Sequence, residues 1–166
     1  MPSAYFKTEG LVIKKMPFGE ADFLVRVLTK DFGKIDILAK GARKTASKLN
    51  LHLDILNHIR MQFVKNGERL PTLMDAEIIS RFDDWFLSAD KLSVAGKILQ
   101  VLDMTVLTGA RDEKLFFMLL DFFGKAEDEK SAVDFLRSFF EHEGYGNTLP
   151  PEFEERILRL WPHLKN

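Results

Sequence analysis

The spacing of the hydrophobic residues changes near Phe82, and this change constrains the fold more than any other feature of the sequence. Before it, apolar residues occupy alternate positions, as at Phe23, Val25 and Val27, which is the period of a β-strand with one buried face. After it they recur every three or four positions, as in residues 132–140, which is the period of an α-helix. The pattern predicts an α+β protein with two domains, residues 1–82 built of strands and residues 83–166 built of helices.

Turn signals divide the first half into five short strands. Residues 29–33 separate two alternating runs and predict a hairpin. Asn66-Gly67 favours a second hairpin, because both central positions of a type I′ turn need positive φ. The predicted strands cover residues 11–13, 23–28, 34–39, 59–63 and 73–82. Five short strands with tight turns are typical of a small barrel or sandwich.

The second half carries start and stop signals for four helices. Asp112 is a predicted N-cap, and Ser131 followed by Asp134 resembles a capping box. The predicted helices cover residues 88–107, a nearly all-apolar stretch around 115–120, residues 131–143 and residues 153–161. The boundary between the two domains is placed near Phe82.

Composition excludes several classes of site. The 166 residues contain no Cys, which rules out disulfides, thiol nucleophiles, Fe–S clusters and Cys-ligated zinc. No apolar run approaches the ~18 residues of a membrane helix, and the start of the sequence does not resemble a signal peptide. We therefore expect a cytoplasmic protein with no membrane partner.

The charge is divided unevenly along the chain. The whole sequence carries 24 basic and 25 acidic residues, a net charge of −1. Residues 1–80 hold 13 basic and nine acidic residues, whereas residues 81–166 hold 11 and 16, so the two parts carry +4 and −5. Such a division is found where a basic nucleic-acid surface is joined to an acidic module, but it also arises from uneven composition of two domains.

The most informative segment is the stretch of residues 40–48. It contains four cations, no acid occurs between Asp36 and Asp54, and small residues fill the gaps. A phosphate backbone is attracted to such a surface, because each neutralised phosphate releases condensed counterions. The alternative is a solvated loop whose charges aid only solubility. The predicted contacts are the four cations of the segment and three on nearby strands: Lys40, Arg43, Lys44 and Lys48, with Lys14, Arg26 and Lys34.

Two aromatic residues beside predicted turns, Phe18 and Phe32, are candidates for stacking on bases. Most of the 15 Phe residues are expected in the core instead.

Nothing in the sequence argues for catalysis or for a cofactor. There is no glycine-rich phosphate loop, and the four His residues are not spaced as metal ligands with carboxylates. The acidic pairs at residues 83–84 and 154–155 stand at predicted helix starts, where the helix dipole favours them. We expect no bound metal.

Several short motifs, taken in order, resemble the RecO family of DNA repair proteins. They are Thr8-Glu9-Gly10-Leu11-Val12-Ile13, Phe18-Gly19-Glu20-Ala21-Asp22, Gly33-Lys34, Ala39-Lys40-Gly41-Ala42-Arg43-Lys44, Ser47-Lys48-Leu49 and Leu70-Pro71-Thr72-Leu73. The likeness is strong over residues 8–82 and extends, more weakly, to Gly144-Tyr145.

The resemblance implies an N-terminal oligonucleotide-binding barrel (OB-fold) followed by a helical domain. It implies a non-enzymatic protein of recombinational repair that binds single- and double-stranded DNA and anneals complementary strands. It also implies that the protein works with RecR to help RecA load onto strands coated by single-strand-binding protein, in the cytoplasm at the nucleoid. The matching basic residues, implied as DNA contacts, are Lys34, Lys40, Arg43, Lys44 and Lys48.

The sequence departs from the family pattern in two ways. Many members have a zinc-binding Cys cluster after the Gly-Tyr segment, whereas residues 146–151 contain no Cys here. Typical members also continue beyond the position of Asn166, which leaves contacts with RecR and with the tail of single-strand-binding protein open.

Two other classes of function remain. An OB-fold module that contacts only protein would show no salt-dependent DNA binding. A metal-dependent nuclease would need clustered carboxylates, which the sequence does not supply.

Overall fold

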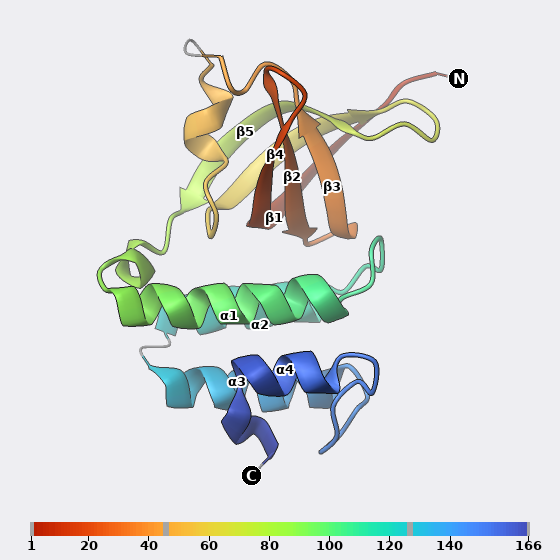
Figure 1. Ribbon diagram of the computed structural model, residues 1–166. Coiled ribbons are helices and arrows are strands. Elements are labelled where there is room, and N and C mark those ends of the chain that lie inside the picture. Colours follow the sequence, from red (N-terminus) through yellow and green to blue (C-terminus); the bar gives the residue numbers. More distant parts are fainter. Residues whose placement is uncertain (1, 45–46, 126–127, 166) are drawn as a thin grey trace. The chain divides into compact units, whose positions relative to one another are not determined.

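The computed structural model describes residues 2–44, 47–125 and 128–165 (Figure 1). Its contacts divide the chain into two compact units. The first unit comprises Met1–Phe82 and Leu107–Phe117, and the second comprises Asp83–Val106 and Met118–Asn166. The segment Leu107–Phe117, which follows the first long helix, therefore packs with the strands.

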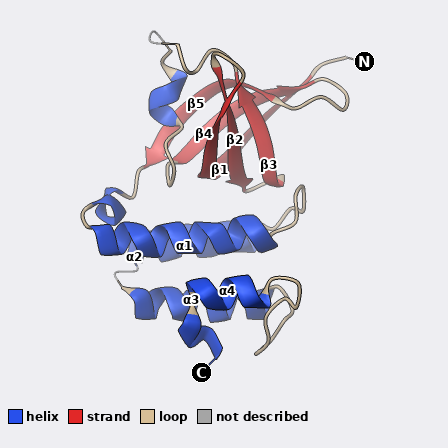
Figure 2. Cartoon of the chain, viewed as in Figure 1, coloured by secondary structure: helices blue, strands red, loops and turns tan. Residues whose placement is uncertain are grey.

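The first unit is a closed five-stranded barrel (Figure 2). Its strands are β1 (Ala4–Phe18), β2 (Asp22–Thr29), β3 (Gly33–Ala39), β4 (His58–Lys65) and β5 (Thr72–Ser80). They are ordered β1-β2-β3-β5-β4, and every pairing is antiparallel except that of β3 with β5. This five-stranded barrel is an OB-fold. Together with the helices of the second unit, it confirms the predicted α+β class.

Strand β1 is much longer than the predicted residues 11–13. Its first part pairs with β4, from Ala4 opposite Lys65 to Leu11 opposite His58. Its second part, from Gly10 opposite Thr29 to Phe18 opposite Asp22, pairs with β2, with a register shift between Val12 and Lys14. The prediction was too short because buried residues lie only in the centre of β1, and apolar and polar residues do not alternate at its two ends.

The barrel core is formed by alternating aliphatic residues from all five strands, including Val12, Val25, Ile37, Ile59 and Leu73. The connection between β3 and β4 adds Ala42 and Leu53 to this core. It also contains a 3-10 helix, η1 (Leu49–His52), which the sequence analysis did not predict.

The second unit is helical. It contains the 3-10 helix η2 (Asp83–Phe86), α1 (Ala89–Thr105), α3 (Glu129–His142), α4 (Glu154–Leu160) and η3 (Pro162–Lys165). Helix α2 (Glu113–Lys125) begins among residues of the first unit and ends among those of the second. Trp85 anchors the core of the second unit: its indole N–H donates to the carbonyl of Phe123 at 2.8 Å, and its ring lies 5.5 Å from that of Phe122.

The starts of α2 and α3 can be compared with the N-caps that the sequence predicts. Asp112 accepts the N–H of Leu115 at 3.0 Å, which confirms it as the N-cap of α2. The predicted start of α3 at Ser131 was wrong, since the N-cap is Asp128, whose carboxylate accepts the N–H of Ser131 at 2.8 Å. Either residue has a side chain that can cap, but Asp128 comes three positions earlier and allows an additional turn of helix.

In the part of the chain that the structure describes, no helix is both long enough and apolar enough to cross a bilayer.

Candidate functional site

The basic loop, residues 40–48, leaves the end of β3 and leads to η1. The structure describes residues 40–44, 47 and 48 of it, while Thr45 and Ala46 lie outside the described residues. The loop stands at the same end of the barrel as the turn between β1 and β2, at the top of Figure 1. Its four cations are all solvent-exposed: Lys40, Arg43, Lys44 and Lys48.

Three hydrogen bonds fasten the basic loop to the β1–β2 turn, residues 18–22. The N–H of Gly41 donates to a carboxylate oxygen of Asp22 at 2.7 Å. The N–H of Arg43 donates to the carbonyl of Ala21 at 2.9 Å, and the Arg43 guanidinium donates to the carbonyl of Gly19 at 2.8 Å. Gly41 has a φ of +68°, a conformation that favours glycine, and the carbonyl of Gly41 accepts the N–H of Lys44 at 3.0 Å.

The buried side chain of Ala42 anchors the basic loop to the barrel core. Its side chain is 0% exposed and belongs to the barrel core, although Gly41 before it is only half-buried and Arg43 after it is exposed. A loop that only carried solubilising charge would have no need of a buried anchor or of three hydrogen bonds. The described part of the basic loop is therefore an ordered element of the barrel.

Lys15 holds η1, the 3-10 helix that follows the basic loop. Its ammonium donates to the side-chain carbonyl of Asn50 in η1 at 2.7 Å and lies 4.4 Å from the centre of the Phe23 ring on β2. This cation is therefore engaged within the barrel, which ties η1 to the strands.

The basic loop carries three lysine ammonium groups besides the Arg43 guanidinium. Within the described residues, those of Lys40, Lys44 and Lys48 form no hydrogen bond and no ion pair. Three exposed cations on an anchored loop form a surface that can neutralise several phosphates of one strand without breaking internal ion pairs.

The other three predicted cations lie in the strands. Lys34 is only 6% exposed, and the β3 backbone there pairs with the segment at Thr108, the Lys34 carbonyl accepting the N–H of Gly109 at 2.9 Å. Arg26 forms a two-point pair with Asp36, at 2.7 and 3.0 Å. Lys14 is half-buried on β1, opposite Arg26. These three cations are therefore less accessible than the four exposed cations of the basic loop.

The structure separates the two aromatic candidates. Phe18 ends β1, is 44% exposed, and directly precedes Gly19, whose carbonyl accepts from Arg43. Phe32 instead packs against Phe6 and Phe63, with ring centres 5.3 and 5.5 Å away. Phe18 therefore offers an exposed ring at the edge of the basic loop, and Phe32 belongs to an internal aromatic cluster.

Sequence reasoning missed two cations at the hairpin of β4 and β5: Lys65, the last residue of β4, and Arg69, in the loop between the two strands. Both are exposed, and the loop ends where the carbonyl of Pro71 accepts the N–H of Leu38 at 2.9 Å, two residues before Lys40. In OB-folds the loop between strands four and five borders the surface that binds oligonucleotides. The Asn66-Gly67 turn signal between these cations could have identified them.

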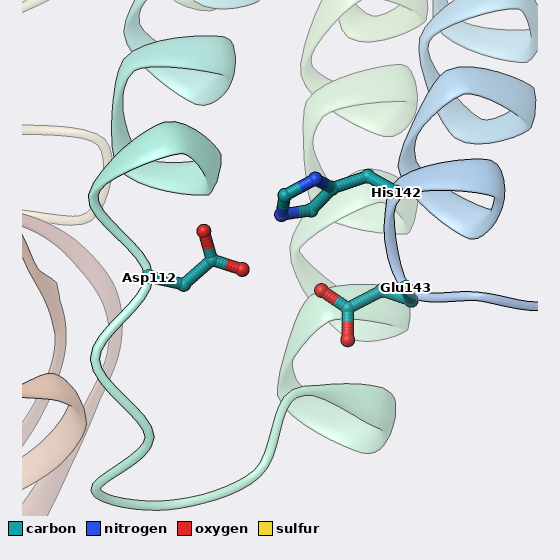
Figure 3. Close-up of side chains that lie close together, drawn as sticks. All are labelled: Asp112, His142 and Glu143. Atoms are coloured by element: carbon teal, nitrogen blue, oxygen red, sulfur yellow. The ribbon is translucent and has the colours of Figure 1, made fainter.

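Figure 3 shows three side chains with oxygen or nitrogen atoms that ligate metals in other proteins. Asp112 belongs to the first unit, where it caps α2. His142 and Glu143 belong to the second unit: His142 is the last residue of α3, and Glu143 is its C-cap, with an N–H that donates to the carbonyl of Phe139 at 2.9 Å. Each of the three residues therefore lies at the end of a helix, Asp112 at the start of α2 and the other two at the end of α3.

Comparison with known proteins agrees with the motifs of the barrel. Residues 1–82 match the family model described as "Recombination protein O N terminal". A protein named DNA repair protein RecO from Thermodesulfovibrio yellowstonii is 27% identical over 117 residues, which are 70% of this chain and 47% of that protein. One of the same name from Acetivibrio thermocellus is 28% identical over 81% of this chain and 54% of its own length.

A third relative, from Halalkalibacterium halodurans and of the same name, is 37% identical over 78 residues, 47% of this chain and 30% of that protein. The chain spans about half the length of the first curated relatives that it matches. The strands form a five-stranded closed barrel, the family model matches the residues of that barrel, and the relatives also match residues of the helices. The chain therefore belongs to the recombination protein O (RecO) family.

Proposed function

We propose that this protein binds DNA, both single- and double-stranded, through the phosphate backbone, and that the basic loop is its principal contact. The observation that supports this most is the anchored loop itself, in which the ammonium groups of Lys40, Lys44 and Lys48 have no hydrogen bond or ion pair with any residue that the structure describes. Ordering the loop before binding lowers the entropy that binding must remove, so the contacts add more to affinity than those of a mobile loop would.

The chemistry of the loop favours binding with little sequence preference. Lysine ammonium groups are point charges that attract phosphate, whereas sequence is read by hydrogen bonds to base edges. The exposed ring of Phe18 adds a surface on which any base can stack, worth ~1–3 kcal/mol. Lys65, at the end of β4, and Arg69, in the loop that follows, are further exposed cations of the barrel.

We place this binding in recombinational DNA repair, because the relatives carry the name DNA repair protein RecO. In the proposed role the protein does not catalyse a reaction. It anneals complementary strands and, with RecR, assists RecA loading on strands coated by single-strand-binding protein. It would act where cellular DNA is, at the nucleoid in the cytoplasm.

The proposal is tested by measuring affinity for a fluorescent single strand as a function of salt. For three to four phosphate contacts we expect log K to fall linearly with log salt, with a slope of about −2 to −3, between about 50 and 200 mM salt. A DNA duplex should show the same trend. Absence of binding at the lowest salt, or an affinity that does not change with salt, would contradict the proposal and favour an OB-fold that contacts only protein.

A further inference from the structure

A carboxylate lies within the proposed DNA-binding surface. Asp22 begins β2, at the end of the turn that holds the basic loop, and its carboxylate accepts the N–H of Gly41 at 2.7 Å. Gly41 separates Lys40 from Ala42, so this bond fixes the backbone between an exposed cation and the buried anchor of the loop. On charge alone, an acid at this place would weaken binding of a polyanion.

We propose that Asp22 is a positioning residue, which orders the basic loop for DNA and so raises affinity in spite of its charge. This inference rests on the function proposed above. The bonds from Arg43 to the turn use the carbonyls of Gly19 and Ala21, which any side chains at those positions would leave in place. Among the described residues of the turn, Asp22 is the one whose side chain bonds the basic loop.

The loop conformation explains why one bond has a large effect. Gly41 is held at a φ of +68°, and its carbonyl accepts the N–H of Lys44. Without a partner for its N–H, Gly41 is free to leave this conformation, because glycine tolerates many backbone angles. The positions of Lys40 and Lys44 depend on the same residue, so both phosphate contacts weaken together when the loop is ordered for a smaller fraction of the time.

Two substitutions of Asp22 separate position from charge. Asp22→Asn and Asp22→Ala remove the same negative charge, but only asparagine keeps an oxygen that can accept the Gly41 N–H. Glu20→Gln is the matched control, because Glu20 is an exposed acid in the same turn and has no hydrogen bond or ion pair among the described residues.

We expect Glu20→Gln and Asp22→Asn to bind a single strand about twofold more tightly than the wild type, since each removes a repulsive charge. Asp22→Ala should bind about fivefold more weakly, because a loop that is ordered for binding only about a fifth of the time lowers the apparent affinity by that factor. Its salt dependence should also be shallower, because fewer phosphates are held. Hydrogen exchange at the Gly41 amide should be fast in Asp22→Ala and slow in the wild type and in Asp22→Asn.

The proposal is overturned if Asp22→Ala, folded by circular dichroism, binds as tightly as Asp22→Asn. If Asp22→Ala does not fold, Asp22→Glu decides: it keeps the charge but displaces the acceptor, so weaker binding supports the proposal and unchanged binding overturns it. A Lys40→Ala/Lys44→Ala variant is measured alongside. If the lysine double variant binds DNA as tightly as the wild type, the proposed function itself fails. If the lysine double variant binds more weakly but Asp22→Ala and Asp22→Asn bind equally, only the role of Asp22 is removed.

Discussion

At the scale of single residues, the cations of the barrel differ in what surrounds them. Lys34 is buried, Arg26 pairs with Asp36, and Lys40 is exposed. Partners depend on strand register: Arg26 meets Asp36 because β2 and β3 pair those two positions. Register is fixed by the whole barrel, so a local pattern does not contain it.

The exposed lysines of the basic loop lead to a prediction about salt dependence. Replacing both Lys40 and Lys44 by Ala should remove about two phosphate contacts and flatten the slope of log K against log salt by about 1.4 for a single strand. Anisotropy with a labelled oligonucleotide measures this slope. The control is Lys130→Ala/Arg156→Ala, which removes two exposed cations from helices α3 and α4. Equal slopes for the two double variants would place the DNA elsewhere on the protein.

His58 leads to a prediction about stability and pH. Burial at the start of β4 lowers the pKa of His58 below its ordinary value of 6.5, Arg60 lowers it further, and Glu9, at 3.5 Å, only partly opposes this. The unfolded chain therefore takes up a proton first as pH falls. Stability is unaffected by this group above about pH 6.5 and is lost below it, down to the lower pKa of the folded state.

Urea unfolding between about pH 7.5 and 5.5 tests this. His58→Gln should lose less stability over that range than the wild type, and His163→Gln, which changes an exposed residue of η3, should behave as the wild type. A wild type and a His58→Gln variant with the same pH dependence would show that His58 is not responsible.

At the scale of elements, the sequence predicted what local pattern and turn chemistry control. The alternating runs gave β2, β3 and β4 to within a few residues, and Asp112 was found as the cap of α2. The ends of β1 and the 3-10 helix η1 were not predictable in this way. The ends of β1 depend on its pairing with two different strands, and η1 depends on the contacts that Lys15 and Ala42 make in the barrel. Both are tertiary contacts.

Gly33 shows how one element depends on another. It has a φ of +68°, and a Cβ added there would lie 2.2 Å from the carbonyl oxygen of Ala110. Gly33→Ala should therefore destabilise the protein by about 2–4 kcal/mol, through backbone strain and displacement of the segment Leu107–Phe117. Gly67→Ala is the control, since Gly67 has a similar φ of +59° with nothing near its Cβ, and should cost about 1 kcal/mol.

Thermal or urea unfolding of the two glycine variants measures the difference. Equal losses at Gly33 and Gly67 would mean that contact with Ala110 contributes nothing beyond the strain of positive φ.

At the scale of the whole molecule, the difference in net charge is larger between the two units than between residues 1–80 and 81–166. The first unit contains 16 basic and 11 acidic residues, a net charge of +5, and the second contains eight and 14, a net charge of −6. Screening at physiological salt limits interactions between exposed charges to about 8 Å, so an acidic unit does not abolish binding by a basic one. We propose that the barrel holds the DNA while the helical unit offers its surface to protein partners.

Hydrogen exchange with and without a single-stranded oligonucleotide tests this account most directly, because it reports each segment of the intact chain separately. We predict slower exchange on DNA binding in residues 18–22 and 40–44, with exchange in α3 (Glu129–His142) unchanged. Slower exchange confined to α3 or α4, with no change in the basic loop or its turn, would contradict the claim that the anchored loop of the barrel is the DNA-binding surface.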